Sequence, residues 1–274
     1  MVGATLSRWS MSYFAVALVC LLAGEVLMAA GFGFPAAAVS SPDSLVVVHL
    51  IAIGWLSLLM LGALFQFVPV MIAGPIYSNA LPLPTLALLL AGLAALVLGF
   101  LQLGGHIPGP YSCFSAAAIL LGSGFALALW NLGRTLWQAR PLPLPARFVT
   151  IGLLCAGATV ALGIVFALVL DGATDNPRLA DLTTYGIPVH AAAGLGGWLT
   201  FTALGVSYRL LAMFMLAPEL YSARSRAALY SGTVALAVVI LGGTAAICLG
   251  RGLNAVFAVS SLLGLCAVAL SGAD

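Results

Sequence analysis

The sequence contains no lysine, and charged residues of either sign make up only 6% of its 274 residues. Soluble domains carry about 25% charged residues, so a soluble globular domain is excluded. All nine basic residues are arginine. A chain this poor in charge needs lipid as its solvent.

Several common functional motifs are also absent. There is no C-x-x-C-H that would attach haem c, no zinc-ligand spacing, no P-loop and no G-x-G-x-x-G after a strand. No nucleic-acid-binding module is present, so nucleic acid is not expected as a partner. Four of the five cysteines lie in apolar runs, where cysteine is usually a small buried hydrophobic residue.

Hydrophobic residues make up 63% of the chain and form runs of about 20 residues or more. The runs do not alternate as the strands of a membrane barrel would, so they predict helices. We therefore predict an all-α polytopic membrane protein of about eight transmembrane helices, arranged as two parallel four-helix units over residues 1–140 and 141–274. The expected spans are 11–34, 44–72, 83–104, 111–138, 147–170, 187–216, 227–249 and 252–271.

The arginines predict the orientation, because loops on the cytoplasmic side are enriched in basic residues. On one side of the predicted topology lie seven arginines, and on the other lie only Arg178 and Arg251 together with four aspartates. Both termini are therefore expected in the cytoplasm, with the membrane being a cell inner membrane. The seven are Arg8, Arg134, Arg140, Arg147, Arg209, Arg224 and Arg226.

Spans two and six repeat one pattern at a period of about 143 residues. With Trp55 aligned on Trp198, Gly54 falls on Gly197, and each stretch opens with Val-His. The matching pairs continue through Ser57 and Thr200, Gly62 and Gly205, Phe65 and Tyr208, and Gln66 and Arg209. The chain is therefore predicted to consist of two homologous halves, an internal repeat.

All three histidines and one carboxylate fall in the outer layer of this topology. His49 and His190 begin the two repeated spans, His106 lies in the third turn, and Glu25 lies in the outer half of span one. An ionisable group inside a bilayer is energetically costly, so each such residue is a candidate for a functional role. The alternatives are structural: each histidine could bond a neighbouring carbonyl, His106 could be solvated, and a protonated Glu25 could bond a hydroxyl group.

Imidazole is a standard axial ligand of haem iron, and a haem needs small residues beside its ligand. Gly54 lies close to His49, and Gly194 and Gly197 follow His190. Ordinary close packing of helices is the alternative explanation for these glycines. A second metal site, for copper, would combine His49, His106 and His190.

The motifs H-x4-G-W-L-S and G-A-L-F-Q-F-V-P-V, and later H-x6-G-W-L-T and G-V-S-Y-R-L, resemble the haem-copper oxidase subunit I superfamily. The best match is to its small subunit I-like members, and nitric oxide reductases and nitric-oxide-response membrane haem proteins are related to these. The resemblance covers mainly spans two and six. It implies four-helix units around a pseudo-symmetry axis, with haem-ligating histidines on the second helix of a unit.

The chain departs from the family at its ligands. Where the family has H-x-H, this chain has His190-Ala191-Ala192, and the tryptophan register places Ala192, not His190, opposite His49. Two residues correspond to about 200° around a helix, so the usual low-spin ligand pair is broken. No histidine cluster for copper and no H-P-E-x-Y motif is present. Oxygen reduction with proton pumping is therefore not expected.

The resemblance implies a subunit that binds haem b through His49, His190 or both, with Gly54, Gly194 and Gly197 beside the haem and Glu25 tuning it. Such a subunit would transfer electrons or bind nitric oxide or oxygen in the outer half of the membrane. As an enzyme it would be a haem-dependent oxidoreductase component without the full haem-copper centre. The alternatives are a cofactor-free accessory or scaffold subunit and an outer-face copper protein. Expected partners are membrane lipid and a redox partner or other membrane subunits, and the chain could form oligomers.

Overall fold

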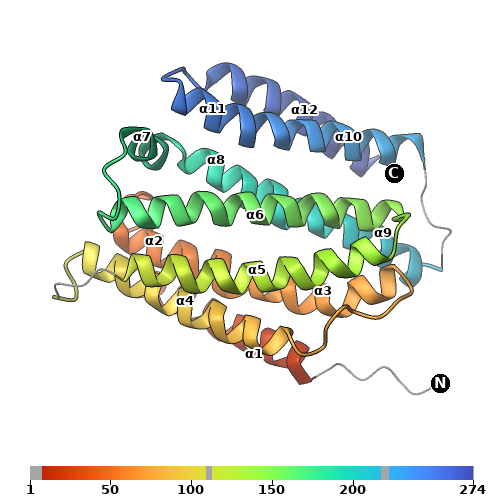
Figure 1. The fold of residues 1–274 in the computed structure, drawn as a ribbon, viewed down its shortest axis with the longest axis horizontal. Helices are drawn as coiled ribbons and strands as arrows, with labels where there is room; N and C mark the ends of the chain where they lie inside the picture. The colour runs from red at the N-terminus through yellow and green to blue at the C-terminus, as the bar shows by residue number, and fades with distance from the viewer. Residues whose placement is uncertain (1–7, 109–112, 217–221, 274) are drawn as a thin grey trace. The chain divides into compact units, whose positions relative to one another are not determined.

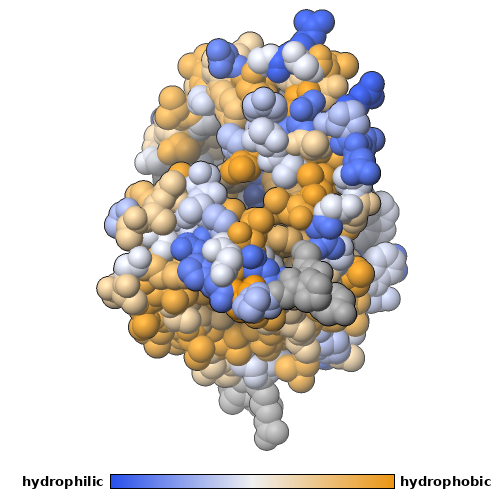
Figure 2. All heavy atoms as spheres, turned by 90° about the vertical axis from the view of Figure 1, so that its left-hand side faces the viewer, coloured by the Kyte–Doolittle hydropathy of each residue, from blue (hydrophilic) through white to orange (hydrophobic). Residues whose placement is uncertain are grey.

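Eight helices are long and apolar enough to cross a membrane in the computed structural model, which describes residues 8–108, 113–216 and 222–273. The predicted fold class is confirmed: the chain is an all-α, multi-pass membrane protein. Hydrophobic residues cover much of the surface seen in Figure 2, as expected for helices that face lipid. The inner-membrane location and the cytoplasmic termini stay predictions.

The chain forms two compact units, one of residues 1–70 and 75–135 and one of residues 71–74 and 136–274. The predicted boundary after residue 140 falls in the connection between α5 and α6 (Figure 1). The first unit is built from α1 (Arg8–Ala29), α2 (Pro42–His49), η1 (Leu50–Ser57), α3 (Leu58–Met71) without its last residue, α4 (Pro82–Leu103) and α5 (Phe114–Gln138) without its last three residues.

The second unit has four spans as well, and two of them change helix type on the way. Its elements are α6 (Leu144–Leu170), α7 (Pro177–Tyr185), α8 (Ile187–Ala191), η2 (Ala192–Phe201), α9 (Thr202–Phe214), α10 (Ala223–Ala237), η3 (Val238–Gly242), α11 (Gly243–Cys248) and α12 (Asn254–Gly272). The η segments are π-helical, with each N–H bonded to the carbonyl five residues back. Such segments are rare in proteins, and those that occur are frequently at functional sites.

Two local features differ from the prediction. The first span ends at Ala29, five residues earlier than expected, because Gly31 takes φ 80° and the Phe32 N–H donates back to the Leu27 carbonyl. The stretch that the prediction left between the fifth and sixth spans, residues 171–186, contains α7, which Asn176 caps. Its Leu182 is buried in a hydrophobic cluster together with Leu162, Val189 and Ile247.

The two units repeat the contacts between their first and second spans. In unit 1, Gly54 of η1 lies against Cys20 of α1; in unit 2, Gly197 of η2 lies against Cys155 of α6. Eight residues, or about two turns, further on, Gly62 meets Tyr13 and Gly205 meets Phe148. Tyr13 also contacts Phe65, and Phe148 contacts Tyr208. The second-span residues of these contacts keep the 143-residue register that the tryptophans predicted, and their first-span partners correspond at a spacing of 135 residues.

The hydroxyl groups at equivalent positions of the repeat make the same bond. Ser57 Oγ donates to the Ala52 carbonyl at 2.7 Å, and Thr200 Oγ1 donates to the Leu195 carbonyl at 2.7 Å. Each bond spans five residues, the separation that is typical of a π-helix. The register therefore holds across η1 and η2, and Ala192 is the counterpart of His49.

At the far end of unit 1 from His106, the connection between α3 and α4 is fastened to α5 by one buried amide. Asn131 accepts from the Ser78 N–H at 2.9 Å and donates to the Ser78 carbonyl at 2.9 Å. The neighbouring Tyr77 N–H donates to Thr135 Oγ1 at 2.9 Å. Asn131 and Thr135 are both buried. The backbone groups of this connection are thus satisfied by side chains of α5.

We expect Asn131→Ala to lower the free energy of unfolding in detergent by about 2 kcal/mol, because it leaves both polar groups of Ser78 without their partner. Asn79→Ala is the matched control, since Asn79 is exposed on the same connection and we expect no measurable change. Thermal unfolding of the purified variants measures the difference. Equal midpoints for the two variants would show that the amide does not hold the connection.

Candidate functional site

His49 is the last residue of α2 and lies directly before η1. The helix that carries it begins at the Ser41 cap, with Pro42 and Asp43 in its first turn, as helix N-termini favour. His49 Nδ1 is 2.7 Å from the Leu45 carbonyl oxygen. A carbonyl can only accept, so Nδ1 carries the proton and the neutral ring keeps its lone pair on Nε2. Among the described residues, none bonds to Nε2.

Aromatic packing fixes the His49 ring as well. The imidazole stacks on Phe100 of α4, with ring centroids 5.2 Å apart and planes inclined by 29°. Phe100 is buried and meets Phe114 edge-on at 5.1 Å. His49 is therefore held on two sides, by its own helix at Nδ1 and by the third span of unit 1 across its face.

His190 lies in α8, two residues before η2, and packs against a different neighbour. Its ring is tilted at 52° to Phe166 of α6, with centroids 5.4 Å apart. A Cβ at Gly163 would lie 3.4 Å from its Cε1. His190 thus faces the first span of its unit, whereas His49 faces the third span of its own. The two histidines are not equivalent, as the offset of two residues predicted.

The space beside the glycines that were expected to make room for a haem is occupied by side chains of neighbouring helices. A Cβ at Gly54 would lie 2.9 Å from Cys20 Sγ, and one at Gly197 would lie 2.6 Å from Cys155 Sγ. At Gly194 it would lie 3.3 Å from Thr159 Cγ2. The alternative explanation, close helix packing, accounts for Gly54, Gly194 and Gly197. We therefore do not propose these glycines as groups that line a haem.

Glu25 lies on α1 one residue beyond Gly24, which packs on Ile51 of η1. The Glu25 side chain is exposed and has no hydrogen bond or ion pair to the described residues. The expected bond from Glu25 to a hydroxyl group is thus not seen in the described part of the chain. Its role beside a haem stays a prediction.

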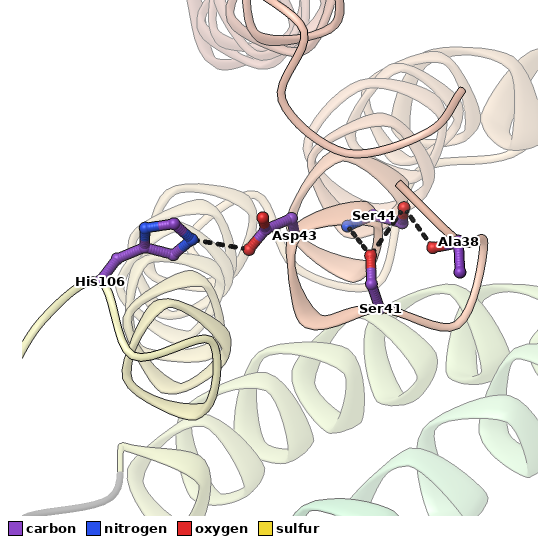
Figure 3. A network of polar contacts seen from close by, with 5 residues as sticks. All are labelled: Ala38, Ser41, Asp43, Ser44 and His106. Carbon is purple, nitrogen blue, oxygen red and sulfur yellow. Dashed lines mark hydrogen bonds and ion pairs between the residues drawn. The ribbon is translucent and has the colours of Figure 1, made fainter. Parts of the chain in front are cut away.

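His106 takes part in a network at one end of unit 1 (Figure 3). Its Nε2 is 2.9 Å from Asp43 Oδ1, and its ring lies against Phe32 at 5.5 Å. In the same network, the Ser44 N–H donates to Ser41 Oγ and the Ser44 hydroxyl donates to the Ala38 carbonyl at 2.7 Å. The network joins the start of α2 to the turn after α4.

Within residues 8–108, 113–216 and 222–273, no group of three or more His, Cys, Asp or Glu side chains is arranged to hold a metal ion. His106 bonds to Asp43, and His49 bonds to its own helix. The copper site of His49, His106 and His190 stays a prediction, and no observation in the described chain favours it.

Sequence reasoning missed the π-helical segments that follow both histidines. The additional backbone atoms in each π turn change the direction of side chains before and after the segment. The sequence shows only that Ser57 and Thr200 occupy equivalent positions, whereas the bond of each to a carbonyl five residues back is seen in the structure. No family model matches the sequence, and a search of curated proteins finds no match either.

Proposed function

We propose that this chain is a haem b-binding membrane subunit, similar to oxidase subunit I, in which His49 Nε2 is the axial ligand. The observation that carries the proposal is the state of the His49 ring. Its Nδ1 carries the proton, which it donates to the Leu45 carbonyl, and no described residue bonds to its Nε2. Histidine ligands of metals almost always donate their other ring nitrogen to such an acceptor, which fixes the ring and raises its basicity.

The packing around His49 fits an axial ligand in one further respect. Phe100 supports one face of the imidazole, so the ring keeps its orientation. His190 is the second candidate ligand, and its packing on Phe166 restrains it similarly. Haem bound by one or two imidazoles supplies one-electron transfer or the binding of a diatomic gas.

The test is an absorption spectrum of the purified, detergent-solubilised protein, oxidised and reduced, with a pyridine haemochrome assay. The expected result is a haem b spectrum at about one haem per chain. Expression with added haem precursor ensures that supply is not limiting. A blank visible spectrum under those conditions would remove the proposal.

A second candidate is a cofactor-free accessory or scaffold subunit of a larger membrane complex. The supporting observation is that Cys20 and Cys155 fill the space beside Gly54 and Gly197, which makes the repeated helices close-packed at those points. In that case the spectrum is blank and the chain co-purifies with other membrane subunits in constant ratio. The same preparation therefore separates the two candidates.

A further inference from the structure

Arg134 on α5 forms a cluster with two aromatic rings in unit 1. Its guanidinium carbon lies 5.4 Å from the centre of the Tyr77 ring and 5.5 Å from that of Trp130. We call Tyr77, Trp130 and Arg134 the arginine–aromatic cluster. Both distances are in the range of cation–π attraction, which orients the planar guanidinium group.

The arginine has no acceptor for its N–H groups in the described part of the chain. Its Nε is buried there without a hydrogen-bond partner, and the two rings lie within cation–π distance of its guanidinium group. The acidic residues of unit 1 are Glu25 and Asp43. Asp43 bonds His106 beyond the end of α4, whereas Tyr77 precedes the start of that 22-residue helix. The positive charge is therefore left uncompensated by carboxylates at its own end of the unit.

The cluster is preorganised by the connection that Asn131 fastens. Tyr77 is held by its N–H bond to Thr135, and Ser78 is held by both polar groups of Asn131. Trp130, Asn131 and Arg134 come from the same helix, so the three side chains and the connection form one fixed arrangement. A ligand that binds here need not order the site, which favours affinity.

The surroundings indicate what the ligand is. Trp130 is 56% exposed and Tyr77 is 42% exposed, near the end of a membrane-spanning helix. Tryptophan and tyrosine concentrate at the headgroup level of a bilayer, which is also the level of lipid phosphates. Arginine binds phosphate oxygens in a charge-assisted, often bidentate manner. Basic sites at this level bind anionic lipid headgroups.

From these observations we propose that the arginine–aromatic cluster binds the phosphate of an anionic phospholipid, with Arg134 as the donor and the two rings at the membrane interface. The site is independent of the haem proposal, since it uses none of the histidines. The cluster would hold one lipid at a defined place on unit 1. A general attraction of lipids to a basic surface would not select such a place.

The experiment measures binding of phosphatidylglycerol to the whole detergent-solubilised chain by native mass spectrometry, with phosphatidylcholine and inorganic phosphate as parallel probes. Wild type is expected to retain phosphatidylglycerol, to retain phosphatidylcholine more weakly, and not to respond to inorganic phosphate. Arg134→Gln should weaken binding of phosphatidylglycerol about fivefold or more. Arg134→Lys keeps the charge but loses the planar donor fork, so we expect an intermediate effect.

Arg140→Gln is the matched control, because Arg140 also lies over an indole ring, that of Trp137 at 3.7 Å, but is exposed. It should retain wild-type binding. The proposal is overturned if Arg134→Gln binds phosphatidylglycerol like wild type, if Arg140→Gln loses as much, or if inorganic phosphate competes fully for the site. If Arg134→Gln does not fold, Arg134→Lys and Trp130→Leu give the same decision.

Discussion

Replacing His49 by alanine is expected to reduce the haem content of the purified protein by about tenfold or more, since loss of supporting residues alone costs 10- to 100-fold in metal affinity. The substitution removes Nε2, the nitrogen that no described residue engages. It also removes the bond to the Leu45 carbonyl, which lies in the last turn of a capped helix. The haem-to-protein ratio, measured by haemochrome assay against protein concentration, gives the result.

His106→Ala is the matched control for His49→Ala. His106 is a second histidine of the same unit, but its Nε2 already faces Asp43 and its side chain is 46% exposed. Haem content should therefore not change. If His106→Ala and His49→Ala reduce haem equally, the loss reflects damage to unit 1 and not removal of a ligand.

His190→Ala then determines the number of protein ligands. If both histidines bind the iron, each single substitution converts a six-coordinate low-spin spectrum into a high-spin one. If His49 is the sole ligand, His190→Ala leaves the spectrum unchanged, because His190 packs on Phe166 for structural reasons only. A wild-type haem content together with a wild-type spectrum in His49→Ala would contradict the proposed ligand in either case.

The eight spans could be predicted because a long apolar run has few alternatives in lipid, where every backbone group must bond within its own helix. The ends were less accurate, as at Ala29, because they depend on glycines in the left-handed region such as Gly31. Helix α7 was missed since it is short and polar. Its signals were the Asn176 cap and the proline that follows.

The immediate surroundings of the histidines could be predicted only in part. The register of the repeat gave the correct counterpart of His49, because identical spacing of tryptophan and glycine survives in both copies. It did not give the partners Phe100 and Phe166, which lie on helices about 50 and 24 residues away in sequence. The role of Gly54 depended on Cys20, and no pattern within one helix identifies the residue opposite it on another helix.

Gly197→Ala is expected to lower the free energy of unfolding by about 3 kcal/mol, at the upper end of the usual cost of overpacking. The added Cβ would overlap the Cβ of Cys155 and lie 2.6 Å from its Sγ. Cys155 is buried on α6, and a Cβ cannot rotate away from its own backbone. The helices must therefore separate, which loosens the packing of η2 on α6.

Gly196→Ala is the control on the neighbouring residue. Its added Cβ would lie 3.8 Å from Leu236 Cδ2, an ordinary van der Waals contact. Alanine is also favoured over glycine within a helix by up to about 1 kcal/mol. Gly196→Ala should therefore unfold at the wild-type temperature or slightly above it. Similar midpoints for the two variants would show that the contact with Cys155 does not limit the packing.

A compensating change can separate steric overlap from other effects of the new methyl group. At one contact of this helix pair, the glycine lies on opposite helices in the two units. Gly24 of the first span packs against Ile51 in unit 1, whereas Gly194 of the second span packs against Thr159 in unit 2. Cys155→Gly in the Gly197→Ala background likewise places the glycine on the first span and the larger residue on the second, one turn away. We expect the pair to recover about half or more of the lost stability, a coupling measured by a double-mutant cycle. Additive losses would place the cost of Gly197→Ala elsewhere than at Cys155.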